Sequence, residues 1–277
     1  MNPELKQSII GHPEVSAFLE RIHRSNDEVF IENNLDSFTK FIFVLSDSVD
    51  KDFTPNLELS EEKVVISYNQ ILSDGTQNIF NLGIDPKLFA MDFVNDFDDS
   101  ADERIMAYVA VYNFVNSYVE KPDEFQQGPF IFGDFGVGKT HLLALAAGFL
   151  SKNGHSVAIV NTSNLIDRLE RSEDYTERMR IVGELKSADV LMIDDFGAGR
   201  LTDWLRDEVF GMVFEIRMIT KKPVLVSSNF DIETLTTDYL TYTNKSNDSV
   251  KAARIKERIN FLTKEVQMGG INRRNKI

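Results

Sequence analysis

The sequence of 277 residues contains no cysteine, only four histidines and no internal repeat. The absence of cysteine excludes disulfide bonds, thiolate metal sites and cysteine nucleophiles. No apolar run approaches the roughly 18 residues that a membrane-spanning helix requires, so none is expected. The first residues, MNPELKQSIIGHPEV, lack a basic stretch leading into an apolar one. We therefore expect no signal peptide and a cytoplasmic location.

Charge is unevenly distributed along the chain, whose formal net charge is -14. Residues 1–127 hold 24 acidic and 9 basic side chains, whereas residues 245–277 hold 9 basic and 3 acidic ones. An acidic amino-terminal half repels a phosphate backbone and suits a protein partner, while a basic tail can meet phosphate. Solvated surface explains both regions equally well, so charge alone leaves the partner open.

Residues 1–91 are expected to form a small, mostly helical module. Four apolar residues recur at helical spacing after Pro13, which is well placed for a first helical turn: Val15, Phe18, Leu19 and Ile22. The β-branched and aromatic segment KVVISY (63–68) predicts a strand, and SDGT (73–76) predicts a turn. The polar, acidic residues 94–104 are interpreted as a linker to the next domain.

Residues 92–277 are expected to form a second domain in which strands and helices alternate. It begins with a helix over about 101–119, whose apolar face is expected to comprise Ile105, Tyr108, Val109, Tyr112, Val115 and Val119. Four apolar segments, PFIFG, SVAIVN, ADVLMID and PVLVSSN, then alternate with helices from Gly138 and near 163–171 and 203–219. This alternation predicts an α/β fold with a parallel sheet between helices.

The segment GDFGVGKT (133–140) follows the first of these strands and opens an apolar helix. It fits G-x-x-x-x-G-K-[ST] in the strand–loop–helix setting of a P-loop. Glycines let backbone N–H groups surround phosphate oxygens, and the helix N-terminus adds positive charge. Lys139 is expected to meet the β- and γ-phosphates, and Thr140 to bind Mg²⁺. The expected nucleotide-binding residues are Gly133, Asp134, Phe135, Gly136, Val137, Gly138, Lys139, Thr140 and His141.

Two further strands end in polar residues that a nucleotide site can use. VLMIDD ends in Asp194 and Asp195, at the sheet edge where the P-loop also lies. We expect Asp194 to hold Mg²⁺ and Asp195 to orient the attacking water. Many such ATPases have a longer glutamate in the place of Asp195, so slow hydrolysis is expected. Asn229 follows PVLVSS and can bind the γ-phosphate or the attacking water; a turn-forming asparagine is the alternative.

The carboxyl-terminal segment KAARIKERINFLTKEVQMGGINRRNK displays several arginines. Arg254 and Arg258 are four residues apart and share one face of an expected helix. Such a pair suits contact with a γ-phosphate, including across a subunit boundary. A solvated helix face, with a frayed basic tail at Arg273 and Arg274, is the alternative.

These motifs, in this order, resemble the bacterial replicative helicase loaders of the DnaI/DnaC type, which are AAA+ ATPases. The resemblance covers most of residues 92–277 and includes the segment TDWLRDEVFGMVFEIRM (202–218). It implies that Asn229 is the sensor-1 residue and that Arg254 is an arginine finger acting on a neighbouring subunit. Arg258 lies one turn beyond it, and Arg274, or Arg273, matches a sensor-2-like position; the resemblance implies that Arg258 and Arg274 contact the nucleotide.

Residues 1–91 resemble the amino-terminal module of DnaI-type loaders more weakly. The resemblance implies that this module binds a DnaB-type replicative helicase and that the chain loads it onto single-stranded DNA during primosome assembly. It also implies weak, ATP-dependent contact with that DNA. Many DnaI-type loaders carry a Cys/His zinc site here, but this chain has no cysteine and widely spaced histidines, so no zinc is expected. An apolar core, or the partner, would have to hold the module together.

Three other functions stay open. A transposition-assisting ATPase of the IstB type shares the core, but a more basic chain without an acidic module is expected for it. A metabolic P-loop kinase needs an acceptor-binding region and a basic lid, and no clear lid is evident. An ATP-gated switch with little turnover is compatible with Asp195 in the place of glutamate.

Overall fold

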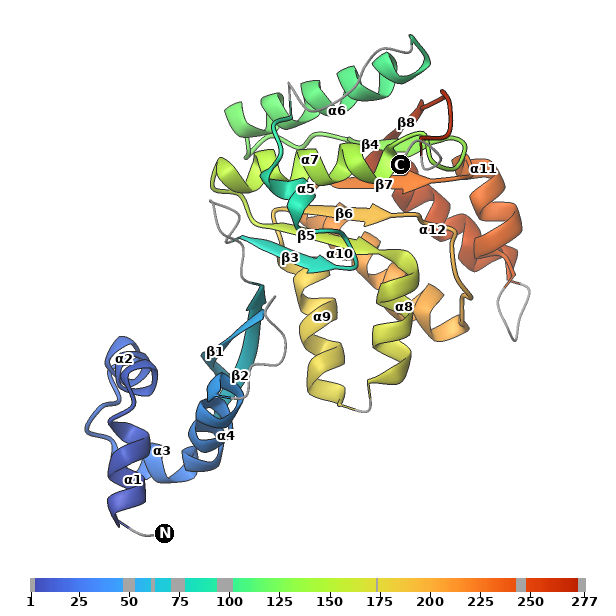
Figure 1. Ribbon diagram of the computed structural model, residues 1–277. Helices are drawn as coiled ribbons and strands as arrows, with labels where there is room; N and C mark the ends of the chain where they lie inside the picture. The colour runs from blue at the N-terminus through green and yellow to red at the C-terminus, as the bar shows by residue number, and fades with distance from the viewer. Residues whose placement is uncertain are drawn as a thin grey trace. The chain divides into compact units, whose positions relative to one another are not determined.

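The computed structural model forms two compact units, residues 1–73 and 74–277 (Figure 1). The residues that it describes are 3–46, 53–60, 63–70, 78–93, 102–172, 174–242 and 248–273. The boundary expected at residues 91/92 lies inside the second unit. The reason is that strand β3 (Ile79–Leu82) pairs with β5 (Val157–Asn161) of the larger sheet. No helix in the described ranges is long and apolar enough to cross a membrane.

The described residues of the amino-terminal unit form four helices and a β-hairpin. The helices are α1 (Pro3–Ile10), α2 (Pro13–Arg21), α3 (Glu28–Asn33) and α4 (Leu35–Ser46), and the hairpin strands are β1 (Phe53–Ser60) and β2 (Lys63–Gln70). The expected helices and the strand over KVVISY are therefore confirmed, with Pro13 in the first turn of α2. The predicted SDGT turn lies outside the described residues.

This unit has an apolar core of its own. The buried residues are Ile9, Val15, Phe18, Leu19, Phe30, Ile31, Leu35, Phe38, Phe41, Leu57 and Val64. Two polar side chains join the helices to the hairpin backbone. Arg21 donates to the Leu57 carbonyl at 2.9 Å, and Asn34 Oδ1 accepts from the Val64 N–H at 2.7 Å. Burial of apolar area and satisfied backbone groups thus stabilise the helix–hairpin arrangement without any covalent cross-link.

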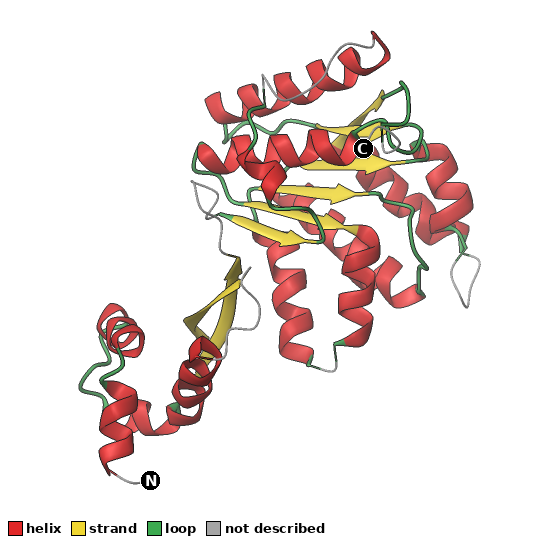
Figure 2. Cartoon of the chain, viewed as in Figure 1, coloured by secondary structure: helices red, strands yellow, loops and turns green. Residues whose placement is uncertain are grey.

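The second unit contains a six-stranded sheet in which every pair of neighbours is parallel (Figure 2). The strand order is β3-β5-β6-β7-β4-β8. The remaining strands are β4 (Gly128–Phe132), β6 (Val190–Asp194), β7 (Val224–Ser228) and β8 (Thr263–Gln267). The four strands expected from the sequence are β4 to β7, and they are almost completely buried because helices cover both faces.

Helices cover the two faces of this sheet in two groups (Figure 1). On one face lie α5 (Lys87–Ala90), α6 (Asp102–Glu120) and α7 (Lys139–Lys152). On the other lie α8 (Thr162–Arg171), α9 (Tyr175–Ser187), the π-helical segment η1 (Leu205–Gly211), α10 (Met212–Thr220) and α12 (Ser249–Leu262). The short α11 (Ile232–Thr234) and a second π-helical segment, η2 (Leu235–Leu240), follow β7.

The buried face of α6 differs from the expected one. Its fully buried apolar residues are Ala107, Val111, Phe114, Val115 and Tyr118; of the six residues expected on the buried face, Val115 is fully buried and Tyr108 and Val119 are half-buried. Ile105, Val109 and Tyr112 are between 37% and 41% exposed. Apolar residues occur all around this helix, and apolar spacing alone therefore does not choose the buried side.

Both edge strands were absent from the sequence-based interpretation. In β8, only Thr263 is fully buried. The strand β3 has only four residues and β8 is mostly polar, so neither contains the apolar run by which the central strands are recognised. The pairing of β8 with β4, from Gly128↔Thr263 to Phe132↔Gln267, brings the carboxyl-terminal segment beside the P-loop.

Candidate nucleotide-binding site

The P-loop lies between β4 and α7, at the edge of the sheet where all six parallel strands end. Gly138, with φ 107°, is the N-cap of α7. The first backbone N–H groups of the helix therefore have no carbonyl acceptor within the helix. This places the positive end of the α7 dipole at the loop. The loop and the helix N-terminus together form the anion-binding geometry that the motif predicts.

Lys139 is 7% exposed, and its ammonium group lies within the loop. Its Nζ donates to the carbonyl oxygens of Gly133 at 2.7 Å and Asp134 at 2.8 Å, and to Asn229 Oδ1 at 2.9 Å. Asn229 Nδ2 in turn donates to Asp195 Oδ1 at 2.8 Å. The amide of Asn229 therefore connects the P-loop lysine to the second acidic residue.

Asp194 is the most enclosed acid of the site, with 2% exposure. Its Oδ1 accepts from the Thr140 hydroxyl at 2.9 Å and from the Ser227 hydroxyl at 2.7 Å, while Oδ2 accepts from Asn161 Nδ2 at 3.2 Å. The structure thus brings together Thr140 and Asp194, the two residues expected to hold Mg²⁺. A hydroxyl beside a carboxylate is an all-oxygen donor set, which fits this hard cation.

Asp195 follows β6 in the left-handed region, with φ 53°. A non-glycine residue there is uncommon and requires support from its surroundings. Its N–H donates to Ser227 Oγ at 2.9 Å, and the N–H of Phe196 donates to the Ser227 carbonyl at 2.7 Å. These contacts turn the Asp195 carboxylate toward Asn229.

The segment that follows β8, in which the resemblance implied a sensor-2-like arginine, lies against the P-loop. The N–H of Arg273 donates to the Gly136 carbonyl at 3.0 Å. A Cβ on Gly136, where φ is 77°, would lie 2.1 Å from Asn272 Oδ1, and one on Gly133 would lie 2.0 Å from the Met268 carbonyl oxygen. The P-loop glycines therefore also make room for this segment. No local motif around residues 268–273 signals this contact, because it depends on the β4–β8 pairing.

The predicted arginines are placed differently from one another. Arg254 is exposed on α12 and has no hydrogen bond or ion pair with any residue that the structure describes. Arg258 donates to the Gly211 carbonyl at 2.8 Å and pairs with Glu215 at 3.1 Å, so it is engaged by η1 and α10 rather than by the residues around Lys139. Arg274 lies outside the described residues.

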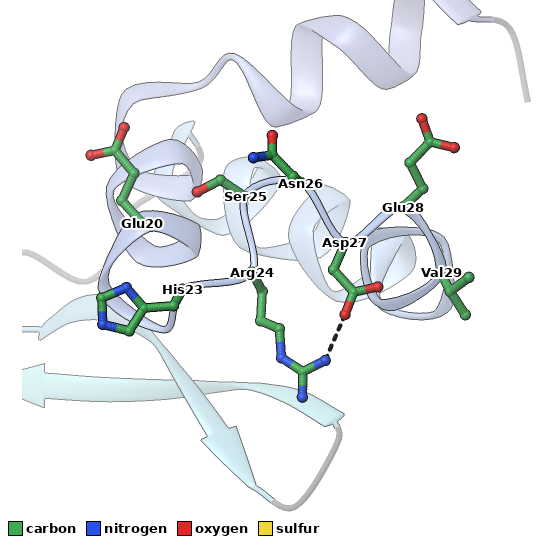
Figure 3. A pocket seen from close by; sticks show the side chains of 8 residues that line it. All are labelled: Glu20, His23, Arg24, Ser25, Asn26, Asp27, Glu28 and Val29. Atoms are coloured by element: carbon green, nitrogen blue, oxygen red, sulfur yellow. Dashed lines mark hydrogen bonds and ion pairs between the residues drawn. The ribbon is translucent and has the colours of Figure 1, made fainter.

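A polar hollow occurs in the amino-terminal unit, between α2 and α3 (Figure 3). Two of its lining residues, Arg24 and Asp27, form an ion pair at 2.5 Å, and the Phe30 N–H and this arginine hold the pKa of the Asp27 carboxyl below its usual range. The hollow carries no phosphate-binding motif and belongs to the unit without the P-loop. Among the described residues, no group of three or more His, Asp or Glu could hold a metal ion.

Comparison with known proteins identifies the family. Residues 76–276 match the protein family described as IstB-like ATP binding protein. The replicative helicase loader DnaI of Bacillus subtilis (strain 168) is 30% identical over an alignment of 295 positions. This alignment covers 98% of this chain and 93% of that protein. The chain belongs to the IstB-like ATP-binding family and to the DnaI-type helicase loaders.

Solved structures of similar proteins agree with this assignment. A crystal structure of DnaI has a TM-score of 0.60 and 33% identity, covering 73% of this chain and all of that one. The crystal structure of a putative primosome component from Streptococcus pyogenes serotype M3 has a TM-score of 0.58 and 27% identity. The match covers 72% of this chain and 96% of that protein's chain. The P-loop AAA+ core predicted for this loader-type chain is therefore confirmed, as is the resemblance on which it rested.

Proposed function

We propose that this chain is an ATPase that loads a DnaB-type replicative helicase onto single-stranded DNA. The observation that carries the proposal is that the likeness to the loader DnaI extends over 98% of the chain, and so through both units. The amino-terminal unit binds the helicase in this proposal. The second unit binds ATP and single-stranded DNA and controls release.

The geometry at the sheet edge supports roles for five residues. Phosphate oxygens carry more charge than the two loop carbonyls and the amide oxygen that Lys139 now contacts, so ATP competes well for its three N–H donors. Thr140 and Asp194 would hold Mg²⁺, which neutralises charge on the phosphates. Asp195 orients the attacking water, and Asn229 holds Asp195.

Arg254 is proposed to act on the ATP of a neighbouring subunit. Its exposure and its lack of a partner within the described chain leave the guanidinium available to a second copy. An arginine supplied in this way stabilises charge in the transition state and is worth about 10³–10⁵ in rate. Hydrolysis would then be slow for the isolated chain and faster on assembly.

A second candidate function follows from the family description, since IstB-like proteins give their name to the matching family. A transposition-assisting ATPase of that kind would coat duplex DNA. Filter binding of duplex and single-stranded DNA at matched salt separates the two functions. A preference for duplex favours the transposition function, whereas ATP-dependent binding of single strands favours the loader.

The test of the loader function is co-purification with the host's replicative helicase, in ATP and in ADP. We expect the full chain to bind and a chain of residues 74–277 to lose binding, because the proposed contact lies on the amino-terminal unit. Lys139→Ala should bind no ATP and give the same result in both nucleotides. Absence of binding by the wild type in every nucleotide state rejects the loader function.

A further inference from the structure

Ser227, on β7, lies between the two acidic residues of the site and is 1% exposed. Its Oγ is 2.7 Å from Asp194 Oδ1 and 2.9 Å from the backbone nitrogen of Asp195. The β6–β7 register ends at Ile193↔Val226, which sets Ser227 opposite Asp194. One buried hydroxyl therefore contacts both acids.

The direction of both hydrogen bonds is fixed by chemistry. A carboxylate only accepts and a backbone N–H only donates, whereas a hydroxyl has one hydrogen to donate and lone pairs that accept. The Ser227 hydrogen therefore goes to Asp194, and its oxygen accepts from Asp195. Neither contact can reverse, so the hydroxyl has a single orientation.

We propose that Ser227 is the positioning residue of the magnesium site, an inference that rests on the ATPase function proposed above. Its hydrogen bond aims Oδ1 of Asp194 at Thr140, whose hydroxyl lies 2.9 Å from the same oxygen. Its acceptor contact holds the left-handed turn at Asp195, φ 53°, which presents that carboxylate to Asn229. Ser227 thus sets the metal-binding acid and the water-orienting acid relative to each other.

Ser228, the next residue of β7, provides a matched control. It is also completely buried, but its Oγ donates to the Phe196 carbonyl at 2.5 Å and accepts from the Phe230 N–H at 3.1 Å. It therefore closes the neighbouring loop without contacting either acid. Replacement of either serine would disturb the end of β7 in general. Only replacement of Ser227 is expected to change the Mg²⁺ dependence of nucleotide binding.

The experiment measures binding of a fluorescent ATP analogue to the full chain, first in EDTA and then in a Mg²⁺ titration. Ser227→Ala should match the wild type in EDTA, because it leaves the P-loop intact. In the titration, the Mg²⁺ concentration that gives half of the metal-dependent increase in nucleotide affinity should be roughly 10–100-fold higher than for the wild type. A loss of this size is typical when the hydrogen-bond partner of a metal ligand is removed. Ser227→Thr, which keeps the hydroxyl, should restore most of this loss, and Ser228→Ala should titrate like the wild type.

Two additions keep the result decisive. If Ser227→Ala folds poorly, Ser227→Cys keeps nearly the same volume with a weak donor and should show the same shift. In an Asp194→Asn background, Ser227→Ala should add little further shift, because it acts through that carboxylate. Wild-type Mg²⁺ dependence in Ser227→Ala, or an equal shift in Ser228→Ala, overturns the inference while leaving the ATP site in place. A wild type that binds no nucleotide in EDTA or in Mg²⁺ instead removes the ATP site itself, and this inference with it.

Discussion

Asp195 is the residue at which binding and hydrolysis of ATP are expected to separate. Asn229 Nδ2 donates to Asp195 Oδ1, and in Asp195→Asn the side-chain amide oxygen can still accept that bond. The variant should therefore bind ATP like the wild type but hydrolyse it about 10²–10⁴-fold more slowly, the usual contribution of a general base. Phosphate release and nucleotide binding, measured on the same preparation, check this; full turnover would exclude Asp195 from orienting the water.

Arg217, in the segment 202–218 on which the resemblance to the helicase loaders partly rests, has a structural role. It is completely buried, and its guanidinium donates to the carbonyl oxygens of Leu185, Ala188, Asp189 and Pro223 at 2.8 to 3.1 Å. Burial lowers its pKa to about 9, so the group is still charged at neutral pH. It ties the end of α9 to α10 and to the starts of β6 and β7.

Replacement of Arg217 should therefore reduce stability rather than nucleotide chemistry. Arg217→Met leaves four carbonyls without this donor, and each buried unsatisfied group costs about 1–3 kcal/mol, so we expect a loss of at least about 3 kcal/mol in the free energy of unfolding. Arg217→Lys keeps a charge but not the planar fork and should lose less. Urea unfolding followed by the fluorescence of Trp204, the single tryptophan, reports this loss for the second unit.

The individual residues of the site were partly predictable from the sequence. Two of them, Lys139 and Thr140, follow the glycine-rich loop, and the other three stand at the ends of apolar strands: Asp194, Asp195 and Asn229. A parallel sheet brings all these positions to one edge. The supporting contacts of Ser227 and Asn161 could not be found in this way. They depend on the register between strands that are distant in the sequence, and a register is not a property of any local pattern.

At the scale of elements, η1 and α12 are joined by a charged cluster. Arg206 is completely buried and pairs with Asp207 at 2.6 Å, and Lys251 of α12 pairs with the same carboxylate at 2.6 Å. The hydrogen bond from Arg206 is the main cause that holds the pKa of Asp207 below its usual value. Asp207 therefore couples the π-helical segment to the helix that carries Arg254.

This cluster predicts a specific pH dependence. The folded pKa of Asp207 is lower than the unfolded one, so its contribution to stability is present above about pH 4 and is lost as the pH falls through the folded pKa. Asp207→Asn should lower the free energy of unfolding by about 1.5–3 kcal/mol at pH 7, because the buried Arg206 loses a hydrogen bond to a charged partner. The difference from the wild type should shrink on acidification. Urea unfolding at pH values from 7 to 3 measures this difference in the free energy of unfolding. Glu208→Gln, at an exposed position of the same segment, is the control and should change stability little. A difference between Asp207→Asn and the wild type that stays constant with pH contradicts the coupling.

Elements were predictable where burial was complete. The strands β4 to β7 are enclosed on both faces and consist mainly of apolar residues, whereas the edge strand β3 has only four residues and the edge strand β8 is mostly polar. The helix α6 was located correctly, but three of the six residues expected on its buried face are exposed, since apolar residues occur on both sides of the helix. Sequence patterns therefore locate the strands that are buried on both faces. They fail for an edge strand or for the buried face of a helix, because the neighbouring element determines these.

At the scale of the whole molecule, the two units have separate apolar cores and should unfold as two transitions. Trp204 lies in the second unit, so its fluorescence should follow that unit alone, while far-UV circular dichroism follows both. A ligand stabilises only the unit to which it binds, by about 2.7 kcal/mol at 100 times its Kd. Mg²⁺ and ATP should therefore raise the midpoint of the fluorescence transition and leave the other transition unchanged, and Lys139→Ala should abolish the rise.

The amino-terminal unit supplies the contrasting half of this prediction. Its helices and hairpin are joined by an apolar core and by the Arg21 and Asn34 contacts to the backbone, so its transition should not respond to EDTA. Thermal melts of the full chain and of residues 74–277, each with and without nucleotide, assign the two transitions. The transition absent from the shorter chain should be the one that the helicase stabilises. A single transition that shifts as a whole with ATP would mean that the two units unfold together as one cooperative body.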